Sequence, residues 1–265
     1  LNINRSLTSS GQTTLYNGFI IGYNYGVIKG VDVTLDFSTL NLKMNVGSSA
    51  SSSTAIGGSS YEYFGVIAGY NATTSSSSST YEGLSGKILE CNVMLSSSIT
   101  LKAYRGREGS YGYMNRSLYW YFAGIVANKQ SGTVDSCYFG DESISDSTSV
   151  RVSGTAASNY YYSTSSQPTT VYRVCGITYT GSCTNCLVDF SRPSTNSLGN
   201  NSSAYYYAFT SGSSASYSYD YTTSGRTRAS FKSSGFNFNY PWVAPVTVND
   251  TTTTFRPYLI SYASR

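Results

Sequence analysis

Near the start of the chain stands the stretch Gly18-Phe-Ile-Ile-Gly22-Tyr-Asn24-Tyr-Gly26-Val-Ile28-Lys-Gly-Val31-Asp-Val33-Thr-Leu35, and its spacing returns several times further along. On both sides of Gly26, apolar residues alternate with other residues. This period of two predicts a strand, a turn and a second strand. One such unit cannot close a core alone, so the repetition indicates copies that pack against each other.

Further copies of this stretch lie at 65–95, 124–139 and 176–190, and a faint one lies at 212–219. A Ser-rich insertion divides the second copy. The third has no insertion and is expected to match the first position by position, while the fourth is shortened. The second-half glycines recur at intervals of roughly fifty residues, within the range of stacked structural repeats. The glycines expected to build the turns and repeats are Gly18, Gly22, Gly26, Gly65, Gly69, Gly86, Gly124, Gly132, Gly176 and Gly181.

These copies predict an all-β fold, a parallel β-helix (β-solenoid) of about four to five irregular coils with long Ser- and Tyr-rich loops. Equivalent residues are expected to stack in columns: Ile20, Ile67 and Val126; Ile28, Ile88, Val134 and Cys183; Val31, Cys91, Cys137 and Cys186; Val33, Val93, Phe139 and Val188. Alternating segments at 40–46, 99–103 and 150–152 are expected to supply a third side to each coil. The alternative is an antiparallel sandwich with coincidental glycine turns.

The repeat also sets the expected domain boundaries, with an N-terminal strand or cap at 1–17, the β-helix at 18–235 and a C-terminal cap or interface arm at 236–265. The N-terminal strand either caps the open end of the solenoid or is lent to a neighbouring subunit, because an exposed sheet edge invites strand addition. The sequence starts at Leu1 rather than Met, which is typical of a processed or partial chain.

The composition narrows the classes of function. The chain has 265 residues, of which only 11% are charged, and roughly three in ten are Ser or Thr. Its net charge of +4 comes from scattered Lys and Arg without a basic stripe, which argues against nucleic acid as a partner. No apolar segment approaches the length of a membrane span. A low-charge surface of this kind favours hydration through hydroxyls or glycans, or assembly that hides its faces.

The glycine, isoleucine, asparagine and cysteine positions of the first three copies resemble the GLUG-motif repeats of microbial cell-surface proteins, whose pattern is close to Gly-x-Ile-x-Gly-x-Asn-x-Gly-x-Ile-x-x-Cys-x-Val. The C-terminal Tyr240-Pro-Trp242 and Arg256-Pro-Tyr258-Leu259 are similar to the segment that often closes such repeats. The resemblance implies secretion, a β-helical stalk or adhesive domain, and usually no chemistry of its own. The long insertions and the high Tyr and Ser content depart from that pattern.

Five cysteines offer candidate disulfides. Cys91, Cys137 and Cys186 fall in one column, where neighbouring strands lie about 4.8 Å apart and within reach of a disulfide. Cys175 and Cys183 flank the fourth glycine turn and form the other plausible pair, and the odd count leaves at least one thiol free or paired between chains. The alternative is that these cysteines fill the column as small apolar residues.

Six Asn-x-Ser/Thr sequons suggest N-glycosylation on a secretory route, at Asn4, Asn71, Asn115, Asn200, Asn201 and Asn249. A chain this rich in Ser and Thr acquires several sequons by chance, so only their placement in loops indicates which of them can carry a glycan. Asn71 aligns with Asn24 in the repeat turn, where an inward side chain is unreachable unless the following insertion exposes it.

Catalytic and metal sites have little support. The chain has no His, which excludes Ser-His-Asp and Cys-His arrangements. The carboxylates of Asp32, Glu90 and Asp135 occupy different offsets after the repeat glycine, so no carboxylate recurs at one position of the repeat to form a catalytic pair. The acidic cluster at 141–146 has no EF-hand spacing, so a solvated loop is favoured over a calcium site. A zinc site is not expected, because no second cysteine pair is present. We expect no catalytic residue, no metal and no cofactor.

Tyrosines suggest how the molecule is used, since Tyr119-Trp120-Tyr121-Phe122 must turn alternate aromatic residues outward. A large aromatic surface favours a partner, either another copy or a glycan. The leading hypothesis is a secreted, glycosylated subunit of an extracellular filament, fibril or surface coat. It would assemble as a homopolymer through solenoid ends, terminal arms and aromatic surfaces. The alternative is a cell-surface adhesin or carbohydrate-binding module, and a polysaccharide-degrading β-helix is less favoured.

Overall fold

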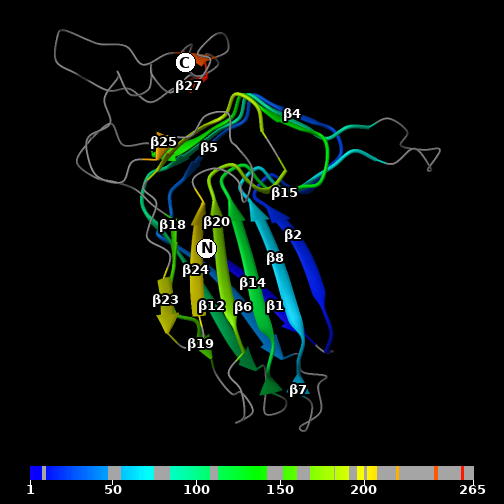
Figure 1. Cartoon of the computed structure of the whole chain (residues 1–265), viewed down its shortest axis with the longest axis vertical. Coiled ribbons are helices and arrows are strands. Elements are labelled where there is room, and N and C mark those ends of the chain that lie inside the picture. Colours follow the sequence, from blue (N-terminus) through cyan, green and yellow to red (C-terminus); the bar gives the residue numbers. More distant parts are fainter. Residues whose placement is uncertain are drawn as a thin grey trace, which may run out of the picture.

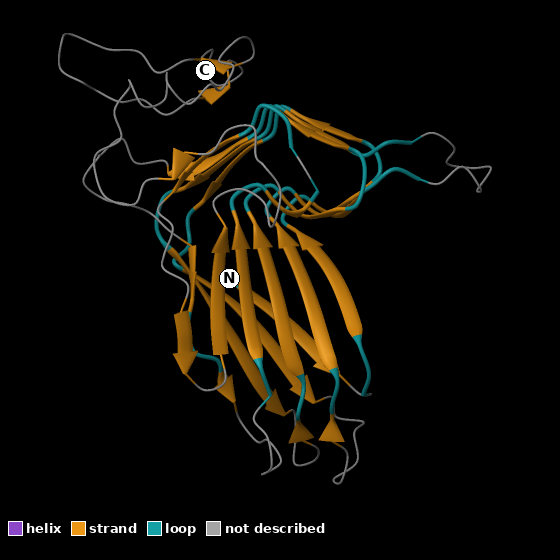
Figure 2. Cartoon of the chain, in the orientation of Figure 1, coloured by secondary structure: helices purple, strands orange, loops and turns teal. Residues whose placement is uncertain are grey.

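The computed structural model describes residues 1–7, 10–46, 55–74, 84–107, 113–141, 152–159, 168–181, 183–190, 196–199, 202–207, 219–220, 242–243 and 258–259. These residues form strands, turns and loops, and no helix occurs among them (Figure 2). Almost all strand pairs are parallel. The prediction of an all-β chain with parallel sheets is therefore confirmed, and the arrangement is consistent with a solenoid-like fold.

Five parallel sheets, which we name A to E, carry most of the described residues (Figure 1). Sheet A contains β1 (Asn2–Leu7), β6 (Thr39–Val46), β12 (Ile99–Arg107), β18 (Val152–Gly154) and β19 (Ser158–Asn159). Sheet B contains β2 (Thr13–Gly18), β8 (Ser59–Gly65), β14 (Ser117–Ala123), β20 (Thr170–Cys175), β24 (Ser202–Tyr207) and the antiparallel β23 (Asn196–Gly199). Figure 1 shows the parallel strands of sheet B side by side in the order of the chain, from β2 to β24.

The other three sheets are narrower. Sheet C contains β3 (Ile21–Asn24), β9 (Ala68–Asn71), β15 (Val126–Lys129) and β21 (Thr178–Thr180). Sheet D contains β4 (Val27–Lys29), β10 (Lys87–Leu89) and β16 (Thr133–Asp135). Sheet E contains β5 (Asp32–Leu35), β11 (Asn92–Leu95), β17 (Tyr138–Asp141), β22 (Leu187–Phe190) and β25 (Tyr219–Asp220). Two short pairs complete the set, β7 (Ala55–Ile56) with β13 (Tyr113–Met114), and β26 (Trp242–Val243) with β27 (Tyr258–Leu259).

The chain visits the sheets in the order B, C, D, E, A and then repeats, and we call one such passage a rung. Rung 1 runs from β2 to β6, rung 2 from β8 to β12, rung 3 from β14 to β18, and the shorter rung 4 from β20 to β22. Rungs 1 to 3 thus have five strands each, rather than the three expected sides, and the described part of rung 4 has three, in sheets B, C and E. The missed strands are those of sheet B, and the glycine motif itself supplies sheets C, D and E.

Three of the four expected columns are confirmed by the strand register. Val33, Val93, Phe139 and Val188 pair directly across sheet E. The column of Val31 and Cys91 lies one residue earlier in the same register, and Ile28 pairs with Ile88 and Val134 in sheet D. The 40–46 and 99–103 segments are confirmed as neighbours in sheet A, where β1 pairs with the outer side of β6.

The expected first column is wrong by one residue. Val126 pairs with Ala68, which pairs with Ile21, so Ile125 and not Val126 continues the column of Ile20 and Ile67. The cause is that Ala123 pairs with Gly65 and takes the place of the glycine. One extra residue in the following turn restores the match at Gly132, since Thr133, Lys87 and Val27 pair in sheet D.

The repeat glycines occupy three kinds of position. Gly18 and Gly65 end strands of sheet B, where a Cβ on Gly65 would lie 2.0 Å from the Ala68 carbonyl oxygen, so only glycine fits. Gly22 and Gly69 lie within strands of sheet C. Gly124 and Gly176 are neighbours in the turn between sheets B and C, where the Gly124 amide donates to the Gly176 carbonyl. Gly26, Gly86, Gly132 and Gly181 lie before or beside sheet D. Gly132 and Gly181 have φ of +78° and +80°, which L side chains rarely adopt.

The corner between sheets D and E repeats an unusual backbone conformation. Gly30, Glu90, Ser136 and Asn185 have φ of +67°, 52°, 52° and 45°. Each precedes a member of the Val31, Cys91, Cys137 and Cys186 column. Three rungs thus place a non-glycine residue where the first uses glycine, and this left-handed conformation is costly for residues with a Cβ.

One hydrophobic core fills the space between sheets A and B and continues between sheets C, D and E. Leu40 and Leu42 of β6 belong to this core together with Trp120 and Tyr172 of sheet B. The Tyr172 hydroxyl accepts a hydrogen bond of 3.0 Å from the Ala103 amide of sheet A. The alternation that the sequence predicts is thereby satisfied, because inward residues of each strand meet those of the opposing sheet.

Candidate functional site

Rung 1 exposes apolar side chains that its repeats bury. Ile20 is 51% exposed, whereas Ile67 and Ile125 in the same column are 0% exposed. Ile21 is 40% exposed, and its partner Ala68 is completely buried. In rungs 2 and 3 the preceding rung covers these positions. In the described part of the chain nothing covers them in rung 1, so this end presents an interior surface to solvent.

Exposed apolar residues gather at this end. Nine large hydrophobic side chains are exposed among the described residues, and six of them belong to rung 1. These six are Phe19, Ile20, Ile21, Tyr23, Tyr25 and Val27. Contiguous exposed apolar surface of this kind marks interaction sites on soluble proteins.

Four strands of rung 1 also have no neighbouring strand on their outer side in the described residues. β2, β3, β4 and β5 each stand at the end of their sheet, and β1 ends sheet A on the same side. A parallel strand edge carries unpaired N–H and C=O groups that template another strand. The exposed apolar residues and the unpaired edges coincide, and we call this surface the N-terminal face.

A second feature is a ladder of tyrosines on the outer face of sheet B. The rings of Tyr63 and Tyr121 stack with centroids 4.4 Å apart and 7° between planes, and Tyr16 lies 5.0 Å from Tyr63. Tyr61 and Tyr119 stack in the neighbouring column at 4.9 Å. The expected outward turn of alternate aromatic residues at 119–122 is thus found, since Trp120 and Phe122 point into the core.

This ladder is largely covered by its own neighbours. Tyr70 of sheet C approaches Tyr16 to 4.8 Å, and Tyr179 approaches Tyr121 to 4.4 Å, leaving Tyr121 only 6% exposed. In rung 4, Arg173 replaces the tyrosine, with its guanidinium carbon 5.7 Å from the Tyr121 centroid. Burial raises the pKa of Tyr63 to about 12, so the phenol stays protonated at neutral pH. The ladder therefore acts mainly as packing between sheets B and C.

Among the described residues, three charged side chains lie inside the protein, and the sequence pattern did not predict their burial. Glu62 is 1% exposed and forms an ion pair with Arg5. Arg116 is completely buried, and its guanidinium donates to hydroxyl and carbonyl oxygens of Gly11, Thr13, Gly57, Ser59 and Ser60 at 2.6–3.2 Å. Arg105 is also buried and donates to Arg116, Thr169 and Thr170 oxygens. These groups tie rungs together rather than form an open site.

The five cysteines are buried in the structure, and none of the candidate disulfides is formed in it. Cys91, Cys137 and Cys186 do share a column, and each thiol donates to the carbonyl two residues earlier at 3.2–3.3 Å. Burial is the largest cause that raises the pKa of the Cys137 and Cys186 thiols. Cys175 packs with Ala123 and Ala127 in a separate cluster, whereas Cys183 belongs to the main core.

The sequons differ in accessibility. Asn4 is exposed on β1, and Asn115 is half-buried before β14. Asn71 is 0% exposed, and its Nδ2 donates to the Gly86 and Thr133 carbonyls at 3.1 and 3.3 Å, so a glycan on this atom does not fit the fold. The insertion after Asn71 does not expose it. Asn200, Asn201 and Asn249 lie outside the described residues.

Acidic groups do not gather in the described part of the chain. There, no three His, Cys, Asp or Glu side chains are placed to hold a metal ion. Glu142 and Asp146 of the acidic cluster lie outside the described residues, as do most of the faint fifth copy and most of 236–265. The described ranges also contain no helix long and apolar enough to cross a membrane.

No protein family, curated protein or solved structure matches this chain. Its function must therefore be inferred from the geometry, in which the N-terminal face is the most distinctive exposed surface.

Proposed function

We propose that the chain is a secreted, glycosylated structural subunit whose rungs form a parallel β-helix and which assembles with copies of itself into extracellular filaments or a surface coat. One observation carries this proposal. Residues such as Ile20 and Ile21 are exposed in rung 1, while their counterparts in rungs 2 and 3 are completely buried.

The occupant that best fits the N-terminal face is a second copy of the chain. The shape and hydrogen-bonding pattern of this face are those that one rung presents to the next, with equivalent residues aligned across each sheet. A surface built from the same repeat can therefore add strands to β2, β3, β4 and β5 at once. Adding several strands together buries the apolar column of Ile20 and pairs the free edges in one step.

Extracellular location and glycosylation are parts of the proposal that rest on the composition and on Asn4. Only 11% of the residues are charged, so solubility before assembly must come from hydroxyl groups or glycans. Asn4 is exposed on β1, where a glycan is sterically tolerated.

The test compares the intact chain with a double variant, Ile20→Lys and Ile21→Lys, by negative-stain electron microscopy and sedimentation velocity over a range of concentrations. Lysine on an edge strand blocks strand addition. We expect ordered assemblies of the unmodified chain that grow with concentration, and monomers of the double variant with an unchanged circular dichroism spectrum.

Leu84→Lys is the matched control, because Leu84 is similarly exposed, at 43%, but lies outside rung 1. This variant should assemble like the unmodified chain. Monomers of the unmodified chain at every concentration, or unimpaired assembly of the double variant, would contradict the proposal.

A further inference from the structure

The outer face of sheet A carries an open depression that the self-assembly proposal does not use. It has a volume of about 340 Å³ and is lined by Asn41, Lys43, Asn45, Tyr104 and Gly106. These residues come from two neighbouring strands, β6 and β12, and the register places Lys43 beside Tyr104 and Asn45 beside Gly106. The volume lies at the lower end of the range for small-molecule sites.

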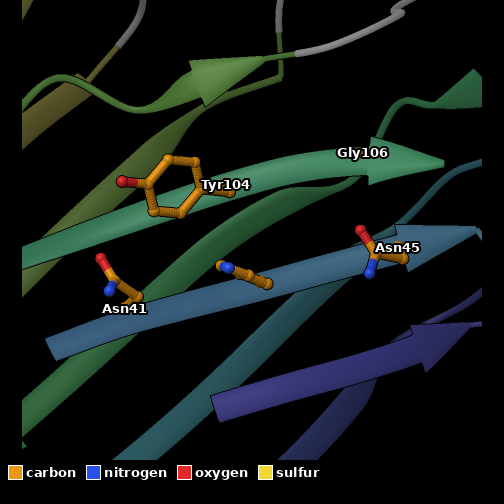
Figure 3. A pocket seen from close by; sticks show the side chains of 5 residues that line it. Asn41, Asn45, Tyr104 and Gly106 are labelled. Carbon is orange, nitrogen blue, oxygen red and sulfur yellow. The ribbon is translucent and has the colours of Figure 1, made fainter. Parts of the chain in front are cut away.

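The lining combines three kinds of group on one side of the sheet. Figure 3 shows the Tyr104 ring on β12 and the Asn41 and Asn45 amides on β6 rising from the same face. The Lys43 ammonium lies 6.0 Å from the centroid of the Tyr104 ring. The inward residues of these strands, such as Leu42 and Ala103, are buried in the core, which fixes the opposite orientation of the lining.

Gly106 keeps the depression open beside Asn45. A Cβ at this position would approach the Asn45 Oδ1 to 2.8 Å, so a larger residue would displace the amide. At the other end, the Asn41 Nδ2 donates to the Asn2 Oδ1 at 2.8 Å, which holds the Asn41 amide in place. The polar groups are thus positioned by neighbours on β1 and β12.

The charge of this face has one sign. β1, β6, β12 and β18 contain no Asp or Glu, while Lys43 and Lys102 alternate outward with the buried residues. In the described residues, the ion pairs are Arg5 with Glu62 and Lys29 with Glu90, so neither Lys43 nor Lys102 is neutralised by a described carboxylate. An uncompensated ammonium beside an aromatic ring favours an anionic ligand with an apolar face.

We propose that this depression binds an acidic sugar, a hexuronate residue of a polysaccharide. The apolar face of the pyranose stacks on the Tyr104 ring, the Asn41 and Asn45 amides hydrogen-bond its hydroxyls, and the Lys43 ammonium pairs with its carboxylate. The site lies on the outer face of sheet A, whereas the tyrosine ladder lies on the outer face of sheet B, and it does not depend on assembly at the N-terminal face.

The experiment measures binding of polygalacturonate and of fully methyl-esterified polygalacturonate to the full chain by isothermal titration calorimetry. We expect binding of the first polymer only. Tyr104→Ala and Lys43→Gln should each weaken it by about tenfold or more, whereas Tyr104→Phe, which keeps the ring, should bind like the unmodified chain. Lys87→Gln is the control, because Lys87 is an exposed lysine of sheet D.

Three results would overturn the proposal. The first is no binding of polygalacturonate, and the second is equal binding of the esterified polymer. The third is binding of polygalacturonate, dextran sulfate and single-stranded DNA alike without an effect of Tyr104→Ala, which would reveal a general polyanion surface. Repeating the titration with the Ile20→Lys, Ile21→Lys variant separates this outcome from failure of self-assembly, because the monomeric variant retains sheet A.

Discussion

Arg5 and Glu62 form an ion pair inside the protein although they belong to opposing sheets, Arg5 to β1 of sheet A and Glu62 to β8 of sheet B. Only one Glu62 oxygen is paired, since its Oε2 has no partner in the described part of the chain. Burial raises the pKa of Glu62 to about 7, and the charges of Arg5 and Arg116 oppose this rise. The folded state therefore holds the proton of Glu62 more tightly than the unfolded chain does.

This linkage predicts that the fold gains stability as the pH falls. Between pH 4.5, the ordinary pKa of Glu, and pH about 7, the folded state binds a proton that the unfolded state releases. The free energy of unfolding should thus rise on acidification from pH 8 to pH 5, by on the order of 3 kcal/mol from this group. Urea denaturation at pH 5, 6, 7 and 8 measures it.

Glu62→Gln supplies the comparison, because it keeps the shape and removes the titration. The variant should show a flatter dependence on pH over this range. Parallel curves for the two proteins would show that Glu62 is not responsible.

Arg116 is predicted to contribute strongly to the stability of the stacked rungs. Its guanidinium donates to the carbonyl oxygens of Gly11 and Gly57, in the segments before rungs 1 and 2, and to the Ser60 hydroxyl of β8. Arg116→Met fills similar space but leaves several buried acceptors unpaired, so the free energy of unfolding should fall by about 3 kcal/mol or more. Chemical denaturation measures the loss.

Lys29→Met tests whether any loss of a cation has this effect. Lys29 is 57% exposed and pairs with Glu90 near the surface, so the change should stay within about 0.5 kcal/mol. Similar losses in both variants would show that Arg116 contributes no more to stability than an exposed lysine does.

Glu90 offers a stabilising substitution. Its φ of 52° is costly for a residue with a Cβ, and Gly30 occupies the equivalent corner in rung 1. Glu90→Gly should therefore raise the free energy of unfolding by about 1 kcal/mol, even though it removes the exposed pair with Lys29. Glu90→Ala, which loses the pair and keeps the Cβ, should be neutral or slightly destabilising. A gain in the alanine variant equal to that in the glycine variant would exclude relief of backbone strain.

The sequence predicted the parts of the fold in which local spacing and packing agree. The column of Val33, Val93, Phe139 and Val188 could be found because a glycine turn fixes its phase in every copy. The prediction loses this phase at Ala123, because an alanine stands there at the position that Gly18 and Gly65 occupy in the first two copies. Nothing in the sequence marks this alanine as the equivalent of a repeat glycine. The strands of sheet B were missed because Ser60 and Glu62 stand at inward positions, where the pattern calls for apolar residues.

The candidate sites depended on tertiary facts that no local pattern contains. Ile20 and Ile125 look alike in the sequence, and only the position of rung 1 at the end of the stack makes one exposed and the other buried. The depression beside Tyr104 requires that β6 and β12 be neighbours in a known register. Alternation in 40–46 and 99–103 predicts that pairing, but not the matching of Lys43 with Tyr104.

Glycan occupancy separates two sequons that are equivalent in the sequence. When the chain is secreted from a eukaryotic host, we expect a glycan on Asn4 and none on Asn71 in the folded protein. The Asn71 Nδ2, the atom that would carry the sugar, is fully buried and bonded to the Gly86 and Thr133 carbonyls, while its Oδ1 accepts from Asn24 at 2.8 Å. A sugar attached during synthesis would break all three bonds and open the corner between sheets C and D, so such chains should not fold. Peptide mass spectrometry measures the occupancy of each site. Asn4→Gln should remove one glycan from the intact mass, whereas a glycan on Asn71 in soluble, folded protein would show that this corner is open in solution.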